Sequence, residues 1–200
     1  MKTVSMSSIW FRMRRTAARM LADRSGIAAT EFAVIVPIML VMFFGTVEFS
    51  SGVAVDRKVT LMARTLSDLT SQSISVNDTD LTGFFAASKG IMTPYPSAPT
   101  QSTISELYVV PGSLTVKVMW SQGHAPRATG STITIPAELK VAGTYLIFSE
   151  VSYRYVPAVG KVMAPTGVNL TDVAYTRPRQ STCVIYPTPS SGSLPNCPTS

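Results

Sequence analysis

Residues 26–47 read GIAATEFAVIVPIMLVMFFGTV, and the charged side chain in this stretch is Glu31. Residues 32–47 form a run of sixteen residues without any charge. A helix needs about 20 mainly apolar residues to cross a bilayer, so the crossing must hold Glu31 near one edge and Glu48 near the other. The stretch predicts one membrane-spanning helix over residues 27–52.

The charges on the two sides of this helix are unequal. Residues 1–26 carry six basic side chains and one acid, whereas the rest of the chain carries eleven basic and ten acidic groups. Cytoplasmic flanks of membrane helices carry the excess of Lys and Arg, so the basic leader is expected in the cytoplasm and the remainder outside it. The part outside is nearly neutral, whereas a nucleic-acid-binding domain has clustered basic residues, so we expect no nucleic-acid partner.

A cleaved secretory signal peptide is the competing interpretation of the run. Its apolar core has 7 to 15 residues and ends at a small-residue cleavage site, but here the run is longer and the following residues 46–58, TVEFSSGVAVDRK, continue as helix. Apolar residues then recur at spacings of three and four, which is typical of one helix face; they are Val55, Val59, Met62, Leu66 and Leu69. This pattern predicts an amphipathic extension over residues 53–72, continuous with the span.

The rest of the chain alternates between turn-rich and β-prone segments. Residues 73–103 read as a linker with a short helix over residues 81–90. Two β-prone runs, 104–110 and 114–120, are separated by Pro-Gly-Ser and predict a hairpin. The alternation along the second arm predicts a single buried face, made of Leu114, Val116, Val118 and Trp120.

A second strand pair is expected further along. Residues 132–135 form a short strand, residues 136–141 a turn or helical loop, and residues 144–155 a long strand. Residues 169–175 add an edge strand. One side of the long strand holds Tyr145, Ile147, Ser149, Val151, Tyr153 and Tyr155. The fold class is therefore α+β, a long N-terminal transmembrane helix continuing into an antiparallel β-sheet domain of about four strands over residues 104–177.

A Pro- and Ser-rich tail, residues 178–200, contains both cysteines of the chain, Cys183 and Cys197. Thiols outside the cytoplasm tend to pair, so we expect a disulfide, with two free thiols as the alternative. Closing a loop of about 15 residues would stabilise the fold by roughly 3 kcal/mol in the chain-entropy model.

The motif at the start of the span, residues 23–40, DRSGIAATEFAVIVPIML, resembles the class III signal of type IV pilins and pseudopilins. Within that group it is similar to the TadE/TadG family of the tight-adherence (Flp) pilus system, and a length of 200 residues favours the shorter, TadE-like kind. The matching positions are Gly26, Ala28, Ala29, Glu31, Phe32, Ala33 and Pro37. Residues 144–157 also resemble a strand of these proteins.

The resemblance implies a pilin-like protein of the bacterial inner membrane, with its C-terminal domain periplasmic or extracellular. A prepilin peptidase would cut between Gly26 and Ile27 on the cytoplasmic side and remove the leader. Glu31 would then pair with the new ammonium of a neighbouring subunit, because a carboxyl in hydrocarbon is costly unless paired. Glu31, Phe32 and Pro37 would belong to the assembly surface. The implied partners are other pilin and pseudopilin subunits, the peptidase, the inner-membrane pilus platform and the membrane.

The leading functional hypothesis is a minor pilin or pseudopilin of a tight-adherence pilus. The alternatives are a permanently anchored periplasmic binding or sensor domain, and a minor pseudopilin of a type II secretion system. The alternative for Glu31 is a place at the headgroup level near Arg24 or water, and Glu48 is expected at the outer interface near Arg57 or water. We expect no enzyme activity, cofactor or metal, and His124, the sole histidine, is expected in a surface loop.

Overall fold

The computed structural model describes residues 13–19, 25–157, 166–190 and 194–199. Much of the expected leader, residues 1–12 and 20–24, lies outside the described residues, as do residues 191–193 and 200 of the expected tail. The chain divides into two compact units, Met1–Val47 and Glu48–Ser200.

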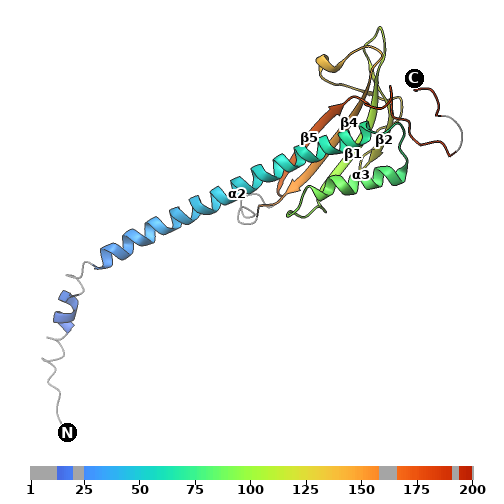
Figure 1. Cartoon of the computed structure of the whole chain (residues 1–200). Helices are drawn as coiled ribbons and strands as arrows, with labels where there is room; N and C mark the ends of the chain where they lie inside the picture. The colour runs from blue at the N-terminus through green and yellow to red at the C-terminus, as the bar shows by residue number, and fades with distance from the viewer. Residues whose placement is uncertain (1–12, 20–24, 158–165, 191–193, 200) are drawn as a thin grey trace. The chain divides into compact units, whose positions relative to one another are not determined.

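Helix α2 is continuous from Ser25 to Ser71 and contains Pro37 (Figure 1). It is long and apolar enough to cross a membrane, and its most apolar window has a mean hydropathy of 2.3 with no buried residue. The prediction of one continuous helix through the apolar run and the amphipathic extension is confirmed.

The second half of α2 packs against the rest of its unit. Four residues of the predicted apolar stripe, Val55, Val59, Met62 and Leu66, have no exposed surface, whereas Leu69 is half-buried. Near its end the helix buries Thr70 instead, whose hydroxyl donates to the carbonyl oxygen of Leu66 at 3.0 Å. A buried threonine is tolerated there because its hydroxyl is hydrogen-bonded to a carbonyl oxygen of its own helix.

Helix α3 spans Asp78–Gly90 and confirms the short helix expected in this region. It begins three residues earlier than expected because a capping box forms, in which Asn77 accepts from the Asp80 backbone N–H and the Asp80 carboxylate accepts from the Asn77 N–H. Such caps satisfy backbone donors that the first helical turn leaves unpaired.

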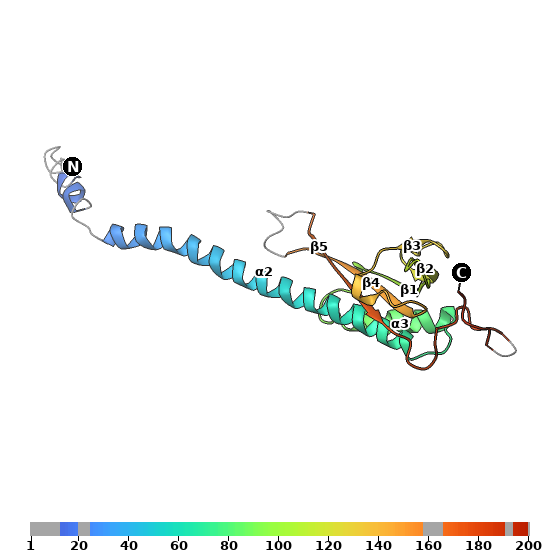
Figure 2. The same ribbon diagram turned by 90° about the horizontal axis from the view of Figure 1, so that it is seen from above.

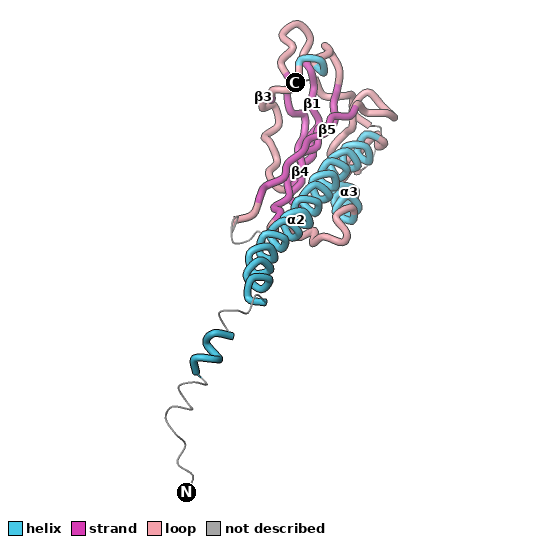
Figure 3. The backbone as a smooth tube through the Cα atoms, turned by 90° about the vertical axis from the view of Figure 1, so that its left-hand side faces the viewer, coloured by secondary structure: helices cyan, strands magenta, loops and turns pink. Residues whose placement is uncertain are grey.

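Five strands form one antiparallel sheet in the order β3-β2-β1-β4-β5. The strands and the 3₁₀ turn between β3 and β4 are β1 (Thr100–Val109), β2 (Val116–Gly123), β3 (Thr132–Ile133), η1 (Ala137–Leu139), β4 (Tyr145–Tyr155) and β5 (Val168–Thr176). The α+β class is confirmed. The second half of α2 and α3 lie side by side against one face of the sheet (Figures 2 and 3).

The helix-covered face is built as the alternation along β4 predicts. Ile147 packs with Leu66 of α2 and Leu81 of α3, and Val151 packs with Met62. Between them Ser149 donates to the Ala63 carbonyl oxygen at 2.6 Å. The polar serine in this face is thus satisfied by the helix backbone.

The predicted single buried face of β2 is wrong. Val116 and Val118 pack in a third cluster with Leu107, whereas Trp120 packs with Leu81 in the cluster under the helices. The pairing of β1 and β2 shifts between Glu106 and Leu107, so one extra residue reverses the alternation. Leu114 is 43% exposed in the turn, with a left-handed φ of 52°.

Strand β1 begins at Thr100, although residues 100–103 were expected to belong to the linker. Thr100 pairs with Tyr153 and Thr103 with Glu150, so the long strand β4 supplies backbone partners for these residues. The polar composition of residues 100–103 did not indicate a strand, because this part of β1 depends on pairing with β4, which is distant in the sequence.

The C-terminal segment is not a free tail. Cys183 is joined to Cys197 by the expected disulfide, and Cys183 and Val184 are buried in the core between sheet and helices. Trp120 Nε1 donates to the Val184 carbonyl oxygen at 2.8 Å, and the Tyr145 hydroxyl donates to the Pro198 carbonyl oxygen at 2.6 Å. A Pro- and Ser-rich composition does not show these contacts because they are made with residues far away in sequence.

Candidate functional site

The residues expected in processing and assembly all lie in the first unit, near the start of α2. Gly26 and Ile27 belong to its first turn, and Glu31 lies one turn further on. Positions four residues apart stand on the same helix face, so Ile27 and Glu31 share a face, whereas Phe32 and Pro37 point in other directions. All five residues are exposed, Ile27 by 57% and Phe32 by 69%.

Gly26 has no packing reason to be glycine. A Cβ added there would meet nothing within 4 Å among the described residues, and its backbone is helical, which any residue adopts. A requirement outside the folded structure of the monomer is therefore the simplest reason for glycine at this position.

The first half of α2 is apolar all the way around. The side chains of residues 38–43 are all exposed, from 48% for Leu40 to 74% for Val41. A helix that is hydrophobic on every side belongs in a membrane or in the interior of a larger assembly. This surface is the broad contact region of the candidate site.

The two carboxyls that flank the apolar run have different surroundings. Glu31 makes no hydrogen bond or ion pair within the described residues, whereas the Oε2 atom of Glu48 accepts a hydrogen bond from the Tyr155 hydroxyl at 3.3 Å. The expected surroundings of Glu48, Arg57 or water, did not include this tyrosine. Burial and the nearby carboxylate raise the pKa of Tyr155, which keeps its hydroxyl a donor.

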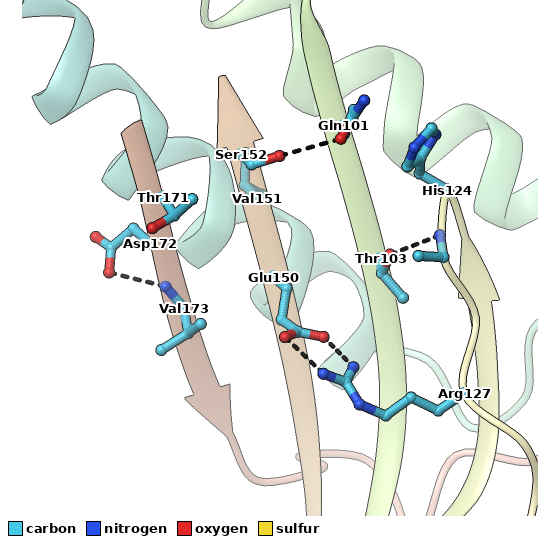
Figure 4. A pocket seen from close by; sticks show the side chains of 11 residues that line it. Gln101, Thr103, His124, Arg127, Glu150, Val151, Ser152, Thr171, Asp172 and Val173 are labelled. Atoms are coloured by element: carbon cyan, nitrogen blue, oxygen red, sulfur yellow. Dashed lines mark hydrogen bonds and ion pairs between the residues drawn. The ribbon is translucent and has the colours of Figure 1, made fainter. Parts of the chain in front are cut away.

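A separate hollow of about 350 Å³ lies on the face of the sheet that the helices leave open (Figure 4). Arg127 reaches over it and forms a two-pronged ion pair with Glu150, in which Nη2 lies 2.7 Å from Oε1 and Nη1 contacts Oε2. The guanidinium also lies 5.4 Å from the centre of the Phe148 ring. The hydrogen bonds that Arg127 donates to Glu150 raise the pKa of Arg127. The sequence offered no pattern that would join these distant residues.

The chemistry of this hollow is that of a satisfied polar surface. The main acid of the hollow, Glu150, is paired with its main base, Arg127. The Asp172 carboxylate accepts a hydrogen bond from the Val173 backbone N–H at 2.8 Å. His124 lines the hollow and is exposed, as expected for a loop residue. Within the described ranges there is no group of three or more His, Cys, Asp or Glu residues that could hold a metal ion.

Comparison with protein-family models matches residues 26–66 to the model described as TadE-like protein. Residues 26–66 form a TadE-like domain. No curated protein and no solved structure matches the chain. The TadE-like domain includes Gly26, Glu31 and Pro37, so the predicted family is confirmed on the residues that suggested it.

The TadE-like domain connects the protein with the tight-adherence pilus system, and proteins of this family are generally structural and non-catalytic. It coincides with α2 as far as Leu66 and thus holds both the exposed apolar half and most of the packed half of the helix. One N-terminal apolar helix fits a membrane anchor in such a protein. The sheet lies outside the match, and so does the resemblance suggested for residues 144–157.

Proposed function

We propose that the protein is a minor pilin or pseudopilin of a tight-adherence pilus, cleaved by a prepilin peptidase between Gly26 and Ile27. The observation that carries the proposal is the TadE-like match over a helix whose first half has exposed apolar side chains on every side. The unexplained glycine at position 26 supports the cleavage, because a peptidase that requires glycine supplies the missing reason.

Cleavage would place a new ammonium on Ile27, one turn from Glu31 and on the same face of α2. Glu31 has no partner among the described residues, and an unpaired carboxyl is costly in hydrocarbon. Pairing with the ammonium of a neighbouring subunit satisfies both groups. Phe32 and Pro37 would contact that subunit through the apolar surface, and the inner-membrane pilus platform would receive the assembled helices.

The proposal also places the leader in the cytoplasm and the sheet on the other side of the inner membrane. The basic residues of the leader support this orientation through the excess of positive charge on cytoplasmic flanks. The Cys183–Cys197 disulfide supports it as well, since disulfides persist in oxidising compartments.

Cleavage is tested by mass spectrometry of the full chain extracted from membranes of cells with and without the prepilin peptidase. We expect a mature N terminus at Ile27 when the peptidase is present, and an intact leader in the Gly26→Val variant. Gly45→Ala is the matched control, because Gly45 lies in the same helix and also has nothing within 4 Å of an added Cβ. An intact leader in the wild-type protein would contradict the proposal and favour a permanent anchor.

Assembly is tested with Glu31→Gln, which removes the charge and keeps the shape of the side chain. We expect normal abundance and normal cleavage but few or no pili on the cell surface, counted by electron microscopy. Thr30→Ala is the control, because the Thr30 hydroxyl bonds to the Ile27 carbonyl oxygen of its own helix. Wild-type numbers of pili in the Glu31→Gln strain would refute the pairing.

A further inference from the structure

Exposed apolar side chains continue along α2 from the last residue of the uncharged run to the C-terminal edge of the predicted span, residues 27–52, and just past it. Val47 is 48% exposed, Phe49 75% and Val53 39%. A helix of about 20 residues starting at Ile27 is about 30 Å long, which matches the thickness of the hydrocarbon layer. When this helix crosses a bilayer, Phe49 and Val53 therefore lie at the depth of the lipid headgroups.

The end of strand β4 contacts α2 in the same stretch of the helix, next to Phe49 and Val53. The Tyr155 hydroxyl at the end of β4 binds Glu48, the residue that follows Val47. One turn further along α2, a Cβ added to Gly52 would lie 3.7 Å from the Tyr155 ring. The end of β4 is thus packed on the first turn of α2 beyond the apolar run.

Two more exposed apolar side chains lie at this end of the sheet. Val156, which is 45% exposed, follows Tyr155 directly, and Val168, which is 48% exposed, pairs with Tyr155 across the strands. Gly167 has a left-handed φ of 73°, and a Cβ there would lie 2.9 Å from the Val156 side chain. We call Phe49, Val53, Val156 and Val168 the basal patch.

We infer that the basal patch lies in the interfacial layer of the bilayer that α2 crosses, with lipid headgroups and the adjoining acyl chains as its partner. Helix α2 runs without a break from the span to Phe49 and Val53, and Glu48, which precedes them, accepts a hydrogen bond from the Tyr155 hydroxyl. Tyrosine is favoured at this depth because its ring is apolar and its hydroxyl polar.

The inference depends on the membrane span of the proposed function, but not on cleavage or pilus assembly. The described chain has no free cysteine, so single cysteines in the oxidised full-length protein can carry an NBD fluorophore at Phe49, Val156 or Val168. Each labelled protein is reconstituted at one copy per lipid nanodisc. The lipids carry a nitroxide quencher either on the headgroup or deep in the acyl chain.

The control sites are equally exposed but lie at other depths. Val41, 74% exposed, is within the span; Val173, 47% exposed, is five residues beyond Val168 on β5, or about 17 Å along the strand. We expect headgroup quenching to reduce the fluorescence at the three patch sites at least twofold more than at Val173. Deep quenching should act chiefly at Val41.

Three other results would overturn either the lipid contact of the basal patch or the membrane anchor itself. If Val41 is quenched but Val156 and Val168 behave like Val173, the patch does not touch lipid although the anchor stands. If Val41 is not quenched, the membrane anchor itself fails, and with it the patch. If Val156 and Val168 become shielded only when several copies share a disc, the patch is a contact between subunits and the lipid assignment is wrong.

Discussion

Glu106 ties the C-terminal segment to the sheet through a single buried side chain. It has no exposed surface, and its Oε1 atom accepts a hydrogen bond from the Val184 backbone N–H at 2.6 Å. Its other oxygen, Oε2, is buried without a hydrogen-bond partner among the described residues. Burial raises the pKa of Glu106 from 4.5 to about 8, although the Val184 hydrogen bond opposes the shift. The side chain is therefore protonated in the folded protein at neutral pH.

This protonation makes stability depend on pH. Between pH 4.5 and about 8 the unfolded chain releases the Glu106 proton while the folded chain keeps it, so the free energy of unfolding should fall as pH rises through this window. Glu106→Gln keeps an oxygen acceptor for Val184 without the proton equilibrium. We expect it to be more stable than wild type by about 5 kcal/mol at pH 9, because each unit between the two pKa values is worth about 1.4 kcal/mol, and similar at pH 4.

Thermal unfolding of the full chain in detergent, followed by near-ultraviolet circular dichroism at pH 4, 7 and 9, measures this difference. Glu138→Gln is the control, since Glu138 is exposed in η1 and its replacement should keep the wild-type pH trend. A Glu106→Gln curve parallel to the wild-type curve at all three pH values would show that Glu106 does not carry the effect.

At the scale of the elements, the ends of β1 and β2 are joined by an unusually close approach. Gly123 ends β2 with a φ of 130°, and a Cβ there would collide with the Ser102 carbonyl oxygen and lie 2.8 Å from the Thr103 Cα. The next residue, His124, donates its backbone N–H to the same Ser102 oxygen at 2.9 Å. Only glycine lets the two backbones approach at this point.

We therefore expect Gly123→Ala to destabilise the fold by about 2 kcal/mol or more, because the backbones must separate to accept the methyl group. Gly83→Ala is the matched control: Gly83 lies in α3 with nothing within 4 Å of an added Cβ, so alanine should stabilise by about 0.5–1 kcal/mol. Thermal unfolding of both variants distinguishes them, and equal midpoints would refute the close-approach argument.

At the scale of the whole sheet-containing unit, the C-terminal segment closes the core between sheet and helices. Val76 donates its N–H to the Ile185 carbonyl oxygen at 2.9 Å, and Ile185 donates to Ile74 at 3.1 Å. Arg179 adds a backbone hydrogen bond to Ser71 at 2.8 Å and an ion pair with Asp68 at 2.5 Å. The last part of the chain is thereby attached to the end of α2 and the residues that follow it.

The disulfide should contribute to this closure. We expect replacement of both Cys183 and Cys197 by serine to lower the free energy of unfolding by about 3 kcal/mol, because the unfolded chain regains the freedom of the closed loop. Oxidised wild type should unfold at a higher temperature than the double variant, and reduced wild type should unfold with the variant. Identical unfolding of the oxidised protein and the variant would exclude a stabilising role.

The sequence by itself determined the elements whose signals are local. The uncharged run 32–47, the three-and-four spacing that includes Val59 and Met62, and the alternation along β4 each depend on side chains close together in the chain. The same holds for the TadE-like motif around Gly26 and Glu31, which can be read without any tertiary contact.

Only the tertiary structure decided the features that depend on distant partners. The extra residue opposite Glu106 and Leu107 moves Trp120 to the helix-covered face. The raised pKa of Glu106 and the contact between Glu48 and Tyr155 likewise require residues from different elements. Burial, bulges and hydrogen bonds of this kind arise when the chain packs, because they depend on which segments meet in space and not on the order of neighbouring residues.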